Sequence, residues 1–209
     1  MTSRSPTRLG RQPSSSSIET RLRILNLVRR LFAATGYGAT SNRILADEVG
    51  LTTRAIYHYF DSKLDIYLSV YEQAQVKVFE AFSECIAGET TFVGQLTEVL
   101  EAAHLLNLED PTLARFLGTA RVDAARDQEL REALRAVEFD VRRRFFGDMS
   151  DLGVRTGEID LVDRPMVDAD VRVVTAGLTD TVSNDPITHR AAVDGIKVLL
   201  EGKLLRPPV

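Results

Sequence analysis

Between Thr53 and His58 the sequence places four side chains that can recognise nucleic acid within one short segment. Thr53, Arg54, Tyr57 and His58 contribute a hydroxyl, a guanidinium, a phenol and an imidazole. An arginine can bind the guanine O6 and N7 acceptors through two hydrogen bonds, and hydroxyl groups suit phosphate oxygens. The pattern therefore predicts a helix that reads base edges in the major groove of DNA.

A helix of this kind must bury its opposite face to hold its position. Ile56, Tyr59 and Phe60 are spaced i, i+3, i+4 and are expected to pack inward. The Thr52 hydroxyl can cap the helix, and Gly50 stands where the preceding short helix needs a left-handed residue. Two short helices joined by a glycine turn predict a helix-turn-helix motif.

A longer register of residues extends this motif in both directions. It comprises Gly36-Tyr37, Thr40-Ser41, Leu45-Ala46, Gly50-Leu51-Thr52, Ile56-Tyr57, Tyr59-Phe60 and Ser62-Lys63. Over about Ile18 to Tyr67 the register resembles the DNA-binding domain of the tetracycline-repressor (TetR) family of bacterial transcription regulators. Two positions depart from the pattern, because Asn42 replaces a usually apolar residue and Ile44 a usually polar one.

The resemblance implies an all-α fold and a set of DNA contacts. A three-helix helix-turn-helix domain would precede a larger helical domain that binds a ligand and mediates dimerisation. The base-reading positions would be Thr53, Arg54, Ala55, Tyr57 and His58. The phosphate contacts would fall on Thr40, Ser41, Thr52 and Lys63, with Arg43 and Tyr59 as additional candidates.

The charge distribution fits a DNA-binding segment at one end of the chain. The 209 residues carry a net charge of −4. Residues 1–67 hold ten Lys+Arg against five Asp+Glu, whereas the remainder holds sixteen against twenty-five. A basic head on an acidic body favours phosphate binding at the head. It argues against a non-specific architectural DNA-binding protein, which would be basic throughout.

Composition also limits the compartment. No stretch approaches the roughly 20 apolar residues of a membrane span, and the N-terminal segment lacks the apolar core of a secretory signal. The single cysteine, Cys85, excludes an internal disulfide and is typical of a reducing cytoplasm. We therefore expect a cytoplasmic protein without membrane contact.

The apolar pattern divides the chain into three parts. Residues 1–17 are rich in Ser, Pro and Arg and are predicted to be disordered, either as a solvated tail or as a basic arm for a minor groove. Residues 18–65 form the predicted DNA-binding domain, and residues 66–209 the ligand-binding and dimerisation domain.

Helix signals continue along the second domain. A fourth helix over about 62–87 is expected to start at the cap Asp61, and a seventh over 129–149 to end before a loop bracketed by Gly153 and Gly157. Other helices are predicted over 92–106, from Asp110-Pro111, over 163–182 and over 186–205.

The resemblance implies a pocket for a small, mainly apolar effector in the second domain. The candidate ligand-binding residues are Phe79, Phe82, His104, Phe116, Arg121 and Phe139, with Phe92 and Phe146 as further apolar candidates. Aromatic residues at helical spacing are more often core, and a lone His is more often a satisfied structural group, so both alternatives stay open.

The last two helices carry the predicted dimer interface. Their apolar stripes consist of Val167, Val171, Val174, Leu178, Val182, Ala192, Ile196 and Leu199. By resemblance these helices pair with their copies as a four-helix bundle. The alternative is that the stripes complete the core of the monomer.

An enzyme is the rival class, and the sequence offers little for it. Its three histidines show no metal-ligand spacing, and no glycine-rich phosphate loop is present, so we expect no catalytic residue, metal or cofactor. The sequence therefore predicts a ligand-responsive repressor that binds a palindromic DNA operator as a homodimer. The alternative is a constitutive or activating regulator without a small-molecule inducer.

Overall fold

The computed structural model describes residues 15–181 and 183–202, except for the side chains of residues 15, 16 and 138–140. All regular secondary structure in these ranges is α-helical, so the predicted all-α fold is confirmed there. In chain order the helices are α1 (Ser15–Ala39), α2 (Asn42–Val49), α3 (Thr53–Ile56), α4 (Lys63–Cys85), α5 (Phe92–Glu109), α6 (Pro111–Arg126), α7 (Gln128–Thr156), α8 (Arg164–Asp180) and α9 (Pro186–Leu200).

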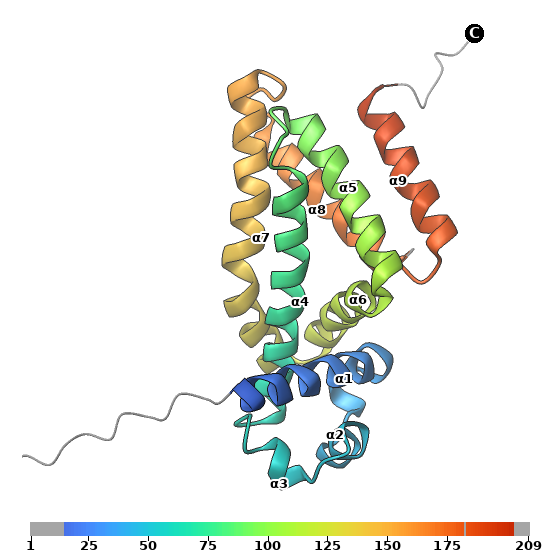
Figure 1. Cartoon of the computed structure of the whole chain (residues 1–209). Helices are drawn as coiled ribbons and strands as arrows, with labels where there is room; N and C mark the ends of the chain where they lie inside the picture. Colours follow the sequence, from blue (N-terminus) through green and yellow to red (C-terminus); the bar gives the residue numbers. More distant parts are fainter. Residues whose placement is uncertain (1–14, 182, 203–209) are drawn as a thin grey trace, which may run out of the picture.

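The first three helices form a small head at one end of an elongated helical body (Figure 1). Helix α4 extends from the head into the body, where α5 and α7 pack against it. Helix α8 packs against α6 and α7, and α9 lies on the outer side of α5. Helix α6 packs against α1 and thereby joins the body to the head. No described helix has the length and apolar character needed to span a bilayer.

The start of α4 and the end of α7 differ from the sequence prediction. Helix α4 is capped by Ser62, whose hydroxyl accepts the Asp65 amide proton at 3.0 Å, and not by Asp61. The Asp65 carboxylate accepts the Asp61 amide proton at 2.9 Å in return, which completes a reciprocal cap. Helix α7 continues through Gly153 and ends only at Gly157, which adopts φ 78°.

Gly153 is glycine for a packing reason. A Cβ atom there would lie 2.5 Å from Ile159 Cδ1 and 2.9 Å from Phe92 Cβ. The residue therefore marks a close approach of α7 to the following loop and to the start of α5. The sequence indicated a loop because a glycine needed for close packing cannot be distinguished from a turn glycine by type alone.

The buried apolar side chains form two clusters. The first joins the head to the start of α4 and continues into α6 and α7 through Leu113, Phe116 and Leu130. The second fills the rest of the body between α4, α5, α7, α8 and α9. Since the first cluster crosses residue 66, the head packs directly on the body, and a domain boundary at that position stays a prediction.

Two polar contacts fix α1 to α6 inside this first cluster. Arg29 of α1 is buried, and its Nη2 donates to Asp110 Oδ2 at 2.5 Å. Near the other end of α6, Asp123 Oδ2 accepts the Tyr37 amide proton at 2.8 Å and the Tyr67 hydroxyl proton at 2.9 Å. Both acidic residues belong to the ends of α6, so that helix holds the head at two points.

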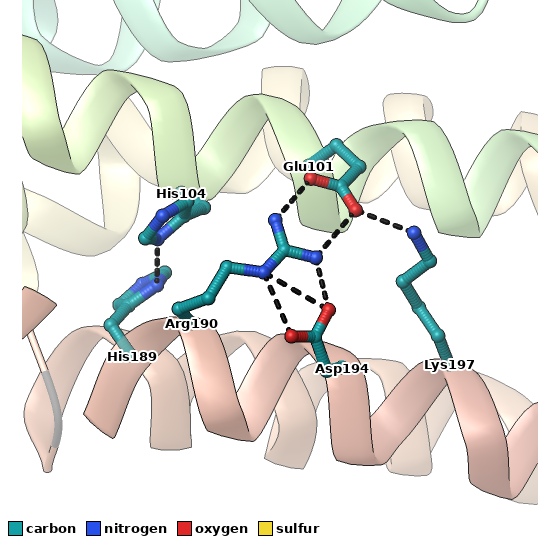
Figure 2. Close-up of polar contacts among 6 residues, drawn as sticks. All are labelled: Glu101, His104, His189, Arg190, Asp194 and Lys197. Atoms are coloured by element: carbon teal, nitrogen blue, oxygen red, sulfur yellow. Dashed lines mark hydrogen bonds and ion pairs between the residues drawn. The ribbon is translucent and has the colours of Figure 1, made fainter. Parts of the chain in front are cut away.

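A charged cluster joins α5 to α9 (Figure 2). Arg190 donates to both Glu101 carboxylate oxygens, at 2.6 and 2.9 Å, and also pairs with Asp194. Lys197 donates to Glu101 Oε1 at 2.5 Å. Hydrogen bonds from Arg190 and then Lys197 lower the pKa of Glu101 to about 2, so this carboxylate is ionised at neutral pH.

Candidate nucleic-acid interface and effector cavity

The turn between α2 and α3 has the local geometry that the sequence predicts. Gly50 adopts φ 69° and ψ 30°, a left-handed conformation that most side chains avoid. The Leu51 amide donates to Ala46 O at 3.1 Å, which closes the end of α2. Thr52 Oγ1 then accepts the Ala55 amide proton at 3.2 Å and caps α3. The motif is therefore held by backbone-specific contacts on both sides of the turn.

Helix α3 itself is shorter than expected. It spans Thr53–Ile56, and the chain continues through turn hydrogen bonds from His58 N to Ala55 O and from Tyr59 N to Ile56 O. Ile56 and Phe60 are buried in the first cluster, as predicted, whereas Tyr59 is only partly buried. This anchorage turns Thr53, Arg54 and His58 toward solvent.

The predicted DNA-contact residues fall into three groups by exposure. The exposed group consists of Ser41, Arg43, Thr52, Thr53, Arg54 and His58, and the partly buried group of Ala55, Tyr57, Tyr59 and Lys63. Thr40 is only 1% exposed, and its hydroxyl donates to Gly36 O at 2.7 Å. The Thr40 hydroxyl therefore stabilises the turn after α1, and a phosphate contact by this residue stays a prediction.

Lys63 contacts the head with its ammonium group. Nζ donates to Tyr37 O at 2.9 Å and to Thr40 O at 3.0 Å, and it lies 4.0 Å from the centre of the Tyr37 ring. Burial lowers the pKa of this ammonium, while Asp127 and Asp123 act in the opposite direction. Because an ammonium has three donors, one remains for a further acceptor such as a phosphate.

Sequence reasoning missed one contact in the motif. The Tyr57 hydroxyl donates to Asn42 Oδ1 at 2.6 Å, which links the residue after α3 to the first residue of α2. The signal was the polar Asn42 at a position where the TetR pattern usually has an apolar residue. Only the fold reveals its partner, since the two residues are 15 positions apart.

A small cavity of about 100 Å³ lies among α4–α9. Of the predicted ligand residues, Phe79, Phe82 and Arg121 line it, together with Phe146. Phe116 does not, because it is fully buried in the first cluster beside Tyr67. The Phe139 side chain lies outside the described residues.

His104 does not line the cavity either. It is buried against His189 of α9, with the two Nδ1 atoms 3.1 Å apart (Figure 2). His189 lines the cavity instead, and burial, followed by His104 and Arg190, lowers its pKa. Arg121 does line the cavity, but its guanidinium is paired with Asp180.

Asn107 is a polar cavity residue that the sequence pattern did not single out. Its Nδ2 donates to Ser183 O at 3.0 Å, while its Oδ1 is buried without a hydrogen-bond partner. Asn107 follows His104 by three positions in an apolar run of α5, which places both on one face. A single polar residue in such a run is the sequence signal that could have indicated it.

A second, larger hollow of about 560 Å³ lies between α7 and α8. It shares Arg142 and Phe146 with the small cavity and is also lined by Arg143, Arg164 and Arg172. The small cavity is thus mainly apolar, whereas the larger hollow is lined by four arginines and the carboxylate of Asp168.

The predicted dimer stripe faces inward over most of its length. Val171 and Leu178 are buried in the second cluster, and Val167, Val174, Ala192 and Ile196 pack against it. Within one chain six residues of the predicted stripe therefore contribute to the core, four of them only partly buried, whereas Leu199 is exposed and Val182 lies outside the described residues. The dimer interface itself stays a prediction. The outward apolar residues of these two helices are Met166, Val173, Ile187 and Leu199.

No group of three or more metal-ligating side chains occurs among the residues that the structure describes. Cys85 donates its thiol proton to Phe82 O at 3.1 Å, and burial raises its pKa, as expected of an unreactive thiol.

Comparison with known proteins agrees with this geometry. The family model described as "Bacterial regulatory proteins, tetR family" matches residues 24–70. The HTH-type transcriptional regulator AcrR of Shigella flexneri is 32% identical over 72 residues, which is 34% of this chain and 34% of that protein. The match thus spans about a third of the relative's length.

Solved structures extend the likeness to the whole fold. Salmonella enterica GusR superposes with a TM-score of 0.73 at 20% identity, covering 91% of this chain and 97% of that one. Bacillus subtilis FadR, solved in complex with stearoyl-CoA, gives a TM-score of 0.71 at 20% identity, with coverages of 87% and 98%. KstR2 of Mycobacterium tuberculosis, described as a ketosteroid transcriptional regulator, gives 0.63 at 18% identity, with coverages of 90% and 95%.

The fold and the motif define a transcription regulator with a helix-turn-helix DNA-binding domain. Residues 24–70 belong to the DNA-binding domain of the tetR family of bacterial regulatory proteins, and the chain as a whole shares the fold of the solved regulators compared above.

Proposed function

We propose that this regulator is a ligand-responsive repressor that binds a palindromic operator as a homodimer. The observation that carries the proposal is the outward surface of α3 and of the turn that follows it. Thr53, Arg54 and His58 are exposed there, and Ile56 and Phe60 are buried beneath them. A rigidly supported helix can place an arginine at guanine acceptors with defined geometry. Repression requires only that the bound protein occlude a promoter.

The second subunit would cover the outward face of α8 and α9. Val173 is 71% exposed and Ile187 82%, and Ala191 on the same side of α9 is also exposed. Apolar residues at successive turns of two helices suit a two-fold four-helix bundle, in which each copy buries the other's face. Two-fold symmetry would place the recognition helices about 34–36 Å apart, or a multiple of that distance, and would demand a palindromic site.

The effector would enter the cavity among α4–α9. A volume of about 100 Å³ is below the roughly 300–1,000 Å³ of common ligand pockets, so binding would require the helices to separate. Separation toward α8 would open the small cavity into the larger arginine-lined hollow. The arginine side chains of the larger hollow favour a mainly apolar molecule with an anionic group. A separate donor group on that molecule, such as a hydroxyl, could give a hydrogen bond to Asn107 Oδ1.

Effector binding would reach the head through α6. Leu113, Leu117 and Arg121 of α6 line the cavity, while Asp110 and Asp123 of the same helix bond to the head and to Tyr67 of α4. Moving α6 would therefore shift α1 and α4 and change the separation of the two recognition helices. Each ~1.4 kcal/mol of effector preference for the shifted form weakens operator binding about tenfold.

The first test is selection of bound sequences from random double-stranded DNA by the full-length protein. We expect a palindromic site, and Arg54→Ala should lose about 1–3 kcal/mol at one base pair of each half-site. Glu48→Gln is the matched control, because Glu48 is an exposed α2 residue outside the proposed contact set. An Arg54→Ala variant with unchanged preference at every position would contradict the assigned reading face.

The second test is calorimetric titration of candidate effectors with and without operator DNA. Stearoyl-CoA and a ketosteroid are the first probes, because FadR was solved in complex with stearoyl-CoA and KstR2 is described as a ketosteroid transcriptional regulator. Coupling is reciprocal, so operator must weaken effector binding by the factor by which effector weakens operator binding. Equal effector affinity in both titrations would favour the alternative of a regulator without an inducer.

A further inference from the structure

The contact between Asn42 and Tyr57 restricts what the Tyr57 hydroxyl can bind. Tyr57 follows α3 directly, and its amide donates to Thr53 O at 3.1 Å, so the ring stands one helical turn after an exposed recognition residue. Its hydroxyl donates to Asn42 Oδ1 at 2.6 Å, and Asn42 is exposed. The bond therefore lies at the surface of the motif, where the proposed reading of DNA takes place.

The Tyr57 hydroxyl can donate only one hydrogen bond. A tyrosine hydroxyl has one proton and two lone pairs. Burial raises the pKa of Tyr57, so the proton is present at neutral pH. Once that proton is donated to Asn42, the oxygen can act toward a third group only as an acceptor.

An acceptor-only hydroxyl distinguishes between the groups that DNA offers. Phosphate oxygens, guanine O6 and N7, and thymine O4 are all acceptors and cannot bind it. The donors in the major groove are the amino groups of adenine N6 and cytosine N4. An apolar side chain at position 42 could not accept the proton, and the same hydroxyl would then be able to donate to phosphates or to guanine and thymine.

We propose that Asn42 is a specificity-determining positioning residue, which directs Tyr57 to an adenine or cytosine amino group in each operator half-site. The inference rests on the proposed reading role of the α3 segment. It adds to that role a defined base preference at one position and a residue outside α3 that sets it.

The experiment is sequence selection from random double-stranded DNA with the full-length wild type and three variants. Tyr57→Phe should lose the adenine or cytosine preference at one position of each half-site and keep the other positions. Asn42→Val should shift the same position toward guanine or thymine, by about fivefold in relative affinity for one hydrogen bond. Asn42→Asp retains an acceptor, so it should keep the wild-type preference while weakening all sequences through repulsion of phosphates.

Controls separate specificity from folding and from the proposed function. Glu48→Gln, also on α2, should leave the profile unchanged. Thermal unfolding followed by circular dichroism should show wild-type stability for all variants to within a few degrees, because Asn42 is exposed. If Asn42→Val unfolds, Asn42→Ala, which likewise lacks an acceptor, should show the same shift toward guanine or thymine.

Identical profiles for wild type, Asn42→Val and Tyr57→Phe would overturn this inference while leaving the regulator function intact. A Tyr57-dependent preference for guanine or thymine in the wild type would overturn it as well. A wild type that selects no sequence at all would overturn both the inference and the proposed function.

Discussion

Replacing Asp123 should weaken the attachment of the DNA-binding head more than its position near the end of α6 suggests. Its Oδ2 accepts two protons, from the Tyr37 amide at 2.8 Å and from the Tyr67 hydroxyl at 2.9 Å. Tyr67 is 0% exposed and its ring contacts Phe32, Tyr37 and Phe116. In Asp123→Ala the Tyr67 hydroxyl would therefore lose its acceptor and have no access to water.

The magnitude follows from the cost of leaving buried donors unpaired. Hydrogen bonds to charged groups contribute about 1.5–3 kcal/mol each, and an orphaned buried group costs about 1–3 kcal/mol. Because one carboxylate serves both donors, we expect Asp123→Ala to lower the free energy of unfolding by about 2–4 kcal/mol. Tyr67→Phe removes one donor, keeps the ring and should cost about 1–2 kcal/mol.

A double-mutant cycle tests the interaction between the two side chains. In the variant carrying both Tyr67→Phe and Asp123→Ala no hydroxyl is left unpaired, so the two effects should fall short of additivity by about 1 kcal/mol or more. The assay is urea unfolding at pH 7 followed by circular dichroism. Additive effects would refute the reasoning, because they would mean that the two side chains do not interact.

A glycine pair provides the matched control. A Cβ atom at Gly36, which has φ 78°, would lie 2.9 Å from Asp123 Oδ1, whereas one at Gly38 would meet nothing within 4 Å. Gly36→Ala should therefore destabilise the protein by about 1 kcal/mol or more, and Gly38→Ala should be close to neutral. Equal effects would show that the Asp123 carboxylate does not constrain this turn.

Three further predictions concern assembly, DNA binding and pH. Val173→Glu should yield folded monomers in sedimentation velocity, and a dimeric Val173→Glu would place the interface elsewhere. Leu178→Glu should instead unfold the body, because Leu178 is only 5% exposed. Lys63→Ala should weaken binding to all DNA sequences nearly equally. The slope of log binding constant against log salt concentration should fall by about 1 for each phosphate that the lysine neutralises in the wild type. An unchanged slope would remove Lys63 from the phosphate-binding residues. Because burial lowers the pKa of His189 in the folded state, the unfolded state takes up a proton below about pH 6.5 that the folded state resists. The free energy of unfolding should thus fall from pH 7.5 to 5.5, and an equally steep fall in His189→Gln would contradict this assignment.

The sequence determined the recognition motif because its signals are local. A left-handed position needs glycine at Gly50, and a helix start needs a hydroxyl such as that of Thr52. The burial of Ile56 and Phe60 follows from their spacing on one short helix. Each of these features depends on residues within a few positions, so the helix-turn-helix and its exposed arginine could be predicted without knowing the rest of the fold.

The tertiary structure decided which face of each longer helix is covered. Helix α8 is apolar on two sides, through Val171 and Leu178 on one and Met166 and Val173 on the other, so periodicity could not select the inward side. Burial of Arg29 likewise depends on an acceptor that lies 81 positions away at Asp110.

Contacts between distant helices also assigned the polar groups of the cavity and the motif. His104 was the candidate on α5, but its ring is taken up by His189 from α9, which brings His189 to the cavity in its place. Asn42 and Tyr57 meet only because the turn at Gly50 folds α2 back toward α3. A hydrogen-bond partner is a property of two positions in space, and a pattern along one segment specifies only the first of them.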